Sequence, residues 1–143
     1  MNRIAVITDI HGNLPALEAS LDAIDAIGVD AVYCGGDLVG YGPHPNEVCR
    51  LIEERGIPTI YGNYDYAIAR ELEDCGCAYV TPHDRELGQR SVAWTLAHTD
   101  QRSKDFRPVA QRAVLTTTCL RARCRCRRSD PGRRARACPP QTT

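Results

Sequence analysis

Apolar residues recur along the first part of the chain at the spacing of an amphipathic helix. They lie three or four positions apart and are Leu14, Leu17, Leu21, Ile24 and Ile27. Residues at this spacing share one face of a helix, and Gly28 follows them as a typical C-terminal cap. A short apolar run of the β type, residues 3–8, comes before this segment. The chain therefore opens with a predicted strand and a predicted helix.

The alternation of strand and helix continues beyond Gly28. Residues 30–34 and 57–61 are apolar runs bounded by turn residues, and they predict two further strands. A helix that carries Val48 and stops at Gly56 is expected between these two strands.

Two more helices are expected, near residues 66–73 and 85–98. In the second of them Leu87 and Trp94 lie seven positions apart and are expected in the core. Strands that alternate with helices in this way indicate an α/β fold with a mainly parallel sheet.

Side chains able to bind a metal ion follow the end of each predicted strand. They are Asp9 and His11 after the first strand, Asp37 after the second, and Asn63 and Asp65 after the third. Open α/β sheets bind their ligands at this edge, and positions i and i+2 of an extended chain face the same side. Each motif alone has an ordinary interpretation as a turn or helix cap. Their occurrence after three consecutive strands favours a metal site.

The net charge of zero conceals a division of charge near residue 101. Residues 1–101 hold sixteen acidic and six basic side chains, whereas residues 102–143 hold two acidic and twelve basic ones. Residues 119–138 contain four Cys and eight Arg, without strand or helix periodicity. Segment 106–143 is interpreted as a disordered basic tail or as a stretch translated in a shifted reading frame. A nucleic-acid-binding tail is a third interpretation, but residues 119–138 offer no aromatic stacking residues or reading motif.

The sequence indicates no membrane segment or secretory signal. No apolar run approaches the roughly 18 residues that a spanning helix requires, and residues 4–7 are too few for the apolar core of a signal peptide. A cytoplasmic location without a membrane partner is the default expectation. In that compartment the eight cysteines are expected to be free thiols.

Three short segments resemble the first three signature motifs of the calcineurin-like metallophosphoesterase superfamily. They are Asp-Ile-His-Gly-Asn at 9–13, Gly-Asp-Leu-Val-Gly at 36–40 and Gly-Asn-Tyr-Asp at 62–65. The small bacterial and archaeal phosphodiesterase branch is the most similar, also through residues 41–43 and the Cys-Gly-Cys of 75–77. The resemblance covers residues 1 to about 100. It implies a truncated domain at 1–105, which is the N-terminal half of a two-sheet α/β/β/α sandwich, followed by the irregular Arg/Cys-rich tail.

The resemblance also implies a site with two divalent metal ions. Asp9 and His11 would bind the first ion, Asp37 would bridge both ions, and Asn63 would bind the second. Mixed imidazole and oxygen ligands favour Mn, with Fe, Zn, Ni or Mg as alternatives. Two such ions can activate a hydroxide for attack on a phosphate ester, here expected to be a diester.

Other residues of these motifs are candidates for catalysis and for substrate binding. His11 and Asp65 are the candidate catalytic residues, with Asp65 placed behind the metal ligands. Asn13 and His44 are candidates for substrate binding, and for His44 a solvated loop position is the alternative.

The sequence also departs from the family pattern. Two later motifs that supply metal-binding histidines, a His-Gly pair and a Gly-His-x-His, are not present, and the remaining histidines are His44, His83 and His98. Tyr64 stands where many members carry a histidine that protonates the leaving group. The first ion then keeps three protein ligands and the second keeps two. We therefore expect an impaired phosphodiesterase, with an inactive metal-binding protein as the alternative. Sheet surface left uncovered would favour an oligomer, and nucleic acid is expected only as a substrate.

Overall fold

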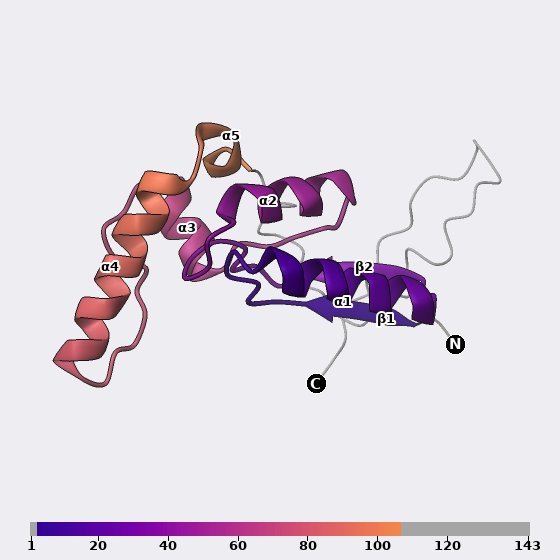
Figure 1. Cartoon of the computed structure of the whole chain (residues 1–143), viewed down its shortest axis with the longest axis horizontal. Helices are drawn as coiled ribbons and strands as arrows, with labels where there is room; N and C mark the ends of the chain where they lie inside the picture. Colours follow the sequence, from indigo (N-terminus) through magenta and orange to yellow (C-terminus); the bar gives the residue numbers. More distant parts are fainter. Residues whose placement is uncertain (1–2, 107–143) are drawn as a thin grey trace, which may run out of the picture. The chain divides into compact units, whose positions relative to one another are not determined.

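The computed structural model of the chain describes residues 3–106 (Figure 1). Its elements are β1 (Ile4–Ile7), α1 (Leu14–Ile27), β2 (Ala31–Cys34), α2 (Pro45–Glu54), α3 (Asn63–Ala69), α4 (Pro82–His98) and α5 (Gln101–Lys104). The described residues all belong to one compact unit of the chain. Apart from Phe106, the tail expected at 106–143 lies outside the described residues.

Helix α1 begins and ends where the sequence predicts. The Asn13 side chain accepts a hydrogen bond from the main-chain N–H of Ala16, which satisfies one of the free donors of the first turn. At the other end Gly28 adopts the left-handed conformation with φ 68° and closes the helix. This helix carries the chain from the end of β1 back to the start of β2.

The strands β1 and β2 pair in parallel, which confirms the predicted α/β class. The register runs from Ile4 opposite Ala31 to Ile7 opposite Cys34. The prediction of a third strand at residues 57–61 is wrong in extent. In the structure this segment forms a single parallel bridge, between Cys34 and Thr59.

Pro58 gives a physical reason for this short pairing. Its carbonyl accepts from the N–H of Cys34 at 2.9 Å, but a proline has no N–H to donate into a ladder. Within residues 3–106 the sheet has two strands. The second sheet of the expected sandwich is therefore not part of the described structure.

The two faces of this sheet have different surroundings. Paired residues of parallel strands share a face, and on one face Ile7 and Cys34 pack into the core with Leu17 and Leu21 of α1, which runs alongside the strands in Figure 1. On the other face the Val6 side chain is 67% exposed. An apolar side of the sheet is thus open in the described residues.

Helix α4 corrects one expectation about the core. Leu87 and Trp94 are both exposed rather than buried, and Trp94 stacks on His98 with 4.0 Å between ring centroids. The buried positions of this helix include Val92 and Thr95. A spacing of seven residues identified one helix face, but a different face, with Gly88, Val92 and Thr95, packs inward.

The cysteines in the described part are of two kinds. Cys34 and Cys49 are free and buried, whereas Cys75 and Cys77 form a disulfide. The expectation of free thiols is therefore wrong for that pair, whose Cα atoms lie 5.5 Å apart, a separation that a disulfide can bridge. No helix among residues 3–106 combines the length and apolar character that a membrane span requires.

Candidate metal centre

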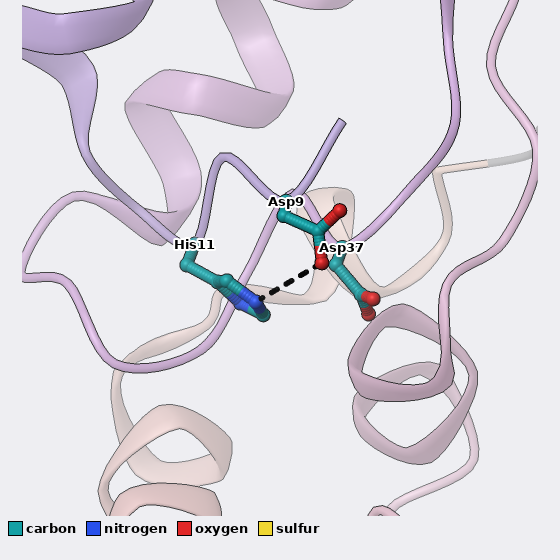
Figure 2. A group of neighbouring side chains, drawn as sticks. All are labelled: Asp9, His11 and Asp37. Carbon is teal, nitrogen blue, oxygen red and sulfur yellow. Dashed lines mark ion pairs between the residues drawn. The ribbon is translucent and has the colours of Figure 1, made fainter. Parts of the chain in front are cut away.

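Three side chains from two neighbouring strand ends meet in one group. Donor atoms of Asp9, His11 and Asp37 all lie within 4.8 Å of one another, and Figure 2 shows the His11 ring directed at the Asp9 carboxylate. His11 Nε2 is 3.8 Å from Asp9 Oδ1. Two carboxylates and an imidazole within this distance can share one divalent ion.

Main-chain hydrogen bonds hold the two loops that carry these residues side by side. The N–H of Asp9 donates to the carbonyl of Gly36 at 3.1 Å, and the N–H of His11 donates to the carbonyl of Asp37 at 2.8 Å. The pairing of β1 with β2 therefore continues past the last strand residues. This continuation brings the two carboxylates and the imidazole to the same place.

The three candidate ligands share an uncommon backbone conformation. The φ angles of Asp9, His11 and Asp37 are 55°, 50° and 54°. Asp and His enter this left-handed region more readily than most residues, but it remains strained and persists where the surrounding structure enforces it. Three such residues in one group are typical of a functional site.

The hydrogen bond made by His11 determines which of its nitrogens is available. Nδ1 lies 3.0 Å from the carbonyl oxygen of Val39. A carbonyl only accepts, so Nδ1 carries the proton and donates it there. In the neutral imidazole Nε2 is then the nitrogen without a proton, and it can bind a cation as in the usual arrangement of metal-ligating histidines.

Asp65 is placed behind the metal group and is only 7% exposed. Its carboxylate accepts hydrogen bonds from main-chain N–H groups of two loops: Asp37 at 2.7 Å, Leu38 at 2.8 Å, Val39 at 3.2 Å and Gly62 at 3.1 Å. Burial raises the pKa of the Asp65 carboxyl, and the hydrogen bonds from Gly62 and Val39 oppose that shift. These contacts fit a residue that positions the Asp37 loop.

The Asn63 side chain is held by the disulfide segment. Its Nδ2 donates to the carbonyl of Cys75 at 3.0 Å and to Sγ of Cys77 at 3.1 Å. With the amino group engaged, Oδ1 is the atom that can serve as a metal ligand. The N–H of Tyr64 donates to Asp37 Oδ1 at 2.9 Å, which places the first turn of α3 beside the metal group.

Glycines allow the loops to approach one another closely. A Cβ atom on Gly36, whose φ is 95°, would overlap the main-chain nitrogen of Gly62. A Cβ on Gly62 would in turn overlap the Asp37 carboxylate. Neither position has room for a larger residue, so these two glycines bring Asp37 and the start of α3 into contact.

Comparison with known proteins decides the family. Residues 2–121 match the sequence profile of the calcineurin-like phosphoesterases. The chain belongs to this family.

Known phosphoesterase structures and one curated relative extend beyond this chain. MJ0912 of Methanocaldococcus jannaschii, an uncharacterized protein, is 48% identical over 65 residues, which are 46% of this chain and 27% of that protein. A metallophosphoesterase from Sphaerobacter thermophilus has a TM-score of 0.52 at 32% identity over 73% of this chain and 40% of that one. A second structure, named as a provisional diadenosine tetraphosphatase, has a TM-score of 0.53 at 26% identity over 73% of this chain and 41% of that one. The chain thus spans less than half the length of each of these proteins.

The two candidate substrate residues of this chain lie next to the His11 loop. Asn13 is exposed, and its Oδ1 caps α1 through the N–H of Ala16. His44 is half-buried at the start of α2, and its main-chain N–H donates to the carbonyl of Gly12 at 3.1 Å. The Asn13 oxygen therefore has a structural role, and for both residues substrate binding stays a prediction.

The structure adds two features of the candidate site that the sequence analysis missed. Val39 supplies the carbonyl that orients His11, and the ring centroid of Tyr41 lies 4.8 Å from that of His11. The contact with Val39 is through the main chain and leaves no mark in the sequence. Tyr41 has a signal, because a bulky residue stands between Gly40 and Gly42.

Proposed function

We propose that this chain hydrolyses phosphate diesters with two divalent metal ions. The observation that carries the proposal is the grouping of Asp9, His11 and Asp37 donor atoms within 4.8 Å. In this proposal Asp9 and His11 Nε2 bind the first ion, Asp37 bridges both ions, and Asn63 Oδ1 binds the second. Mn²⁺ suits this mixed set of nitrogen and oxygen donors.

The donor set fits such ions in charge and in orientation. Two carboxylates give the site enough negative charge to hold divalent cations, while the neutral Asn63 amide limits repulsion of an anionic substrate. Bound cations of this kind lower the pKa of water and neutralise phosphoryl oxygens. His11 is oriented by the carbonyl of Val39, and the backbone of the Asp37 loop is held by Asp65.

The diester specificity is supported by the motifs of residues 9–13, 36–40 and 62–65. The names of the two solved structures, a metallophosphoesterase and a provisional diadenosine tetraphosphatase, support chemistry at a phosphate ester or anhydride. The shared reaction is water attacking phosphorus with departure of an oxygen leaving group.

The test is hydrolysis of bis(p-nitrophenyl) phosphate by the purified chain with added Mn²⁺, followed by absorbance of p-nitrophenolate. We expect EDTA to abolish the activity and Mn²⁺ to restore it. Asp37→Asn should lower the rate by about 100-fold or more, because a ligand contributes at least as much as the residues behind it. Asp22→Asn makes the same chemical change at an exposed position of α1 and should keep the wild-type rate.

Two further outcomes separate the parts of this proposal. Equal rates for wild type and Asp37→Asn would refute the metal-assisted mechanism. Cleavage of p-nitrophenyl phosphate without cleavage of the diester would refute the diester specificity and show that the chain is a phosphomonoesterase.

The second candidate function is metal binding without turnover. It is favoured because residues 1–143 do not contain the later His-Gly and Gly-His-x-His motifs. Isothermal titration calorimetry of the wild-type protein with Mn²⁺ distinguishes it. Binding that Asp37→Asn weakens, without hydrolysis of either substrate, would establish this second function.

A further inference from the structure

Tyr41 belongs to an aromatic cluster next to the candidate metal centre. Its ring centroid is 4.8 Å from that of His11, with the rings nearly perpendicular, and 4.8 Å from that of Tyr64. The Tyr41 side of the cluster is open, because this residue is 58% exposed whereas Tyr64 is 1% exposed. Tyr41 therefore presents an aromatic surface to solvent directly beside a candidate ligand.

The backbone at Tyr41 is held in a strained conformation. Its φ is 54°, in the left-handed region that a bulky residue rarely adopts. Its N–H donates to Ser91 Oγ at 3.3 Å. The neighbours of Tyr41 are both glycines in crowded positions. A Cβ atom on Gly40 would overlap the Tyr64 ring, and a Cβ atom on Gly42 would overlap the His11 carbonyl. The backbone of this loop thus fixes the point from which the Tyr41 side chain projects.

The usual structural roles of a tyrosine do not account for this placement. A tyrosine that served the core would be buried, and this residue is 58% exposed. A residue that served only the turn would be glycine or asparagine, which adopt positive φ with little strain. Strained residues of this kind concentrate at functional sites, so the aromatic side chain itself is what the loop supports.

We propose that Tyr41 is a substrate-positioning residue that stacks on a planar aromatic group of the phosphate ester. The proposal rests on the proposed function, because the phosphate is placed at Asp9, His11 and Asp37. It narrows the substrate class to esters that carry an aryl or nucleobase group close to the phosphate.

The geometry suits stacking better than it suits ionic recognition. Tyrosine offers a large apolar face with two side-chain torsions, so that ordering it on a ligand costs little entropy. Aromatic rings attract one another in offset or edge-on arrangements at the separations already present between Tyr41 and its neighbours. A group one ester bond away from the phosphate would lie beside the exposed face of the ring.

The experiment compares two ligands that differ in planarity and not in carbon count. Phenyl phosphate and cyclohexyl phosphate are titrated into the Mn²⁺-loaded chain by calorimetry, and the ratio of their dissociation constants is measured. We expect the wild-type protein to bind phenyl phosphate about 5- to 10-fold more tightly. Tyr41→Leu should bring the ratio close to one while Mn²⁺ affinity stays unchanged.

Two further variants keep the test independent of folding. Tyr41→Phe retains the ring and should keep the preference for phenyl phosphate. Tyr66→Leu removes a half-exposed tyrosine of α3 that stacks beneath Arg70 and should also keep it. The circular dichroism spectrum of each variant reports its folding.

Each result decides between the proposal and the function on which it rests. Wild type that binds both compounds with Mn²⁺ but without preference would refute the role of Tyr41 alone. A preference that survives in Tyr41→Leu, or is lost in Tyr41→Phe, would refute it as well. Wild type that binds neither compound in the presence of Mn²⁺ would refute the substrate contact, while hydrolysis of bis(p-nitrophenyl) phosphate decides the proposed function separately.

Discussion

Asp65→Asn is the substitution that most directly tests how the site is held together. The wild-type carboxylate uses Oδ2 to accept from the N–H groups of Asp37 and Gly62, and Oδ1 to accept from those of Leu38 and Val39. Asparagine has the same shape but must place an amino group at one of these two oxygen positions. Two main-chain donors then face another donor.

The expected cost follows from those two orphaned donors. A buried donor without its partner costs about 1–3 kcal/mol, and hydrogen bonds to a charged acceptor lie in the upper part of that range. We therefore expect Asp65→Asn to lower the free energy of unfolding by about 3–5 kcal/mol. The Mn²⁺ affinity should fall as well, because the same bonds fix the loop that carries Asp37.

The assay is urea denaturation of the whole chain, followed by circular dichroism at fixed pH. Asp22→Asn is the control for the chemical change, since its side chain is exposed on α1. It should stay within about 0.5 kcal/mol of wild type. A free energy of unfolding for Asp65→Asn as close to wild type as that of the control would refute the role assigned to Asp65.

Three further predictions concern packing and the cysteines. Gly36→Ala should lower the free energy of unfolding by about 3 kcal/mol or more, because its Cβ would overlap main-chain atoms. Gly56→Ala, at φ 60° with open space around it, should lower it by only about 1–2 kcal/mol. Burial raises the pKa of Cys49 to about 12, so native protein at pH 8 should resist iodoacetamide there and react only in denaturant, as peptide mass spectrometry would show. Reducing the disulfide should weaken Mn²⁺ binding severalfold in calorimetry, since it removes the sulfur arrangement that holds the Asn63 amide; equal affinity in both redox states would contradict this.

The strand ends and helix α1 could be predicted because their signals are local. Asp9, His11 and Asp37 stand directly after apolar runs, and in a parallel sheet those runs end at one edge. In the structure their donor atoms lie within 4.8 Å of one another at this edge, and their role as metal ligands stays a prediction.

Other features could not be predicted because they depend on contacts between distant segments. The family resemblance implied a place for Asp65 behind the metal ligands. It did not identify the four main-chain donors from two loops that bind this carboxylate. Leu87 and Trp94 share a helix face, but the sequence does not say which face of α4 turns inward. The Cys75–Cys77 disulfide required geometry that spacing alone leaves open.

The parallel pairing of β1 with β2 has a consequence for how the protein folds. Parallel strands have no hairpin between them, and the bonds that shape the site join partners 28 positions apart, such as His11 with Val39 and Asp37 with Asp65. Closing such long loops is slow compared with forming α1 alone, so the complete ligand set exists only once the sheet is assembled. Free energy released on binding Mn²⁺ then adds to the stability of the native state and not to that of the unfolded chain. The melting temperature should therefore rise with Mn²⁺ concentration, and refolding from urea should give a higher yield when the ion is present from the start.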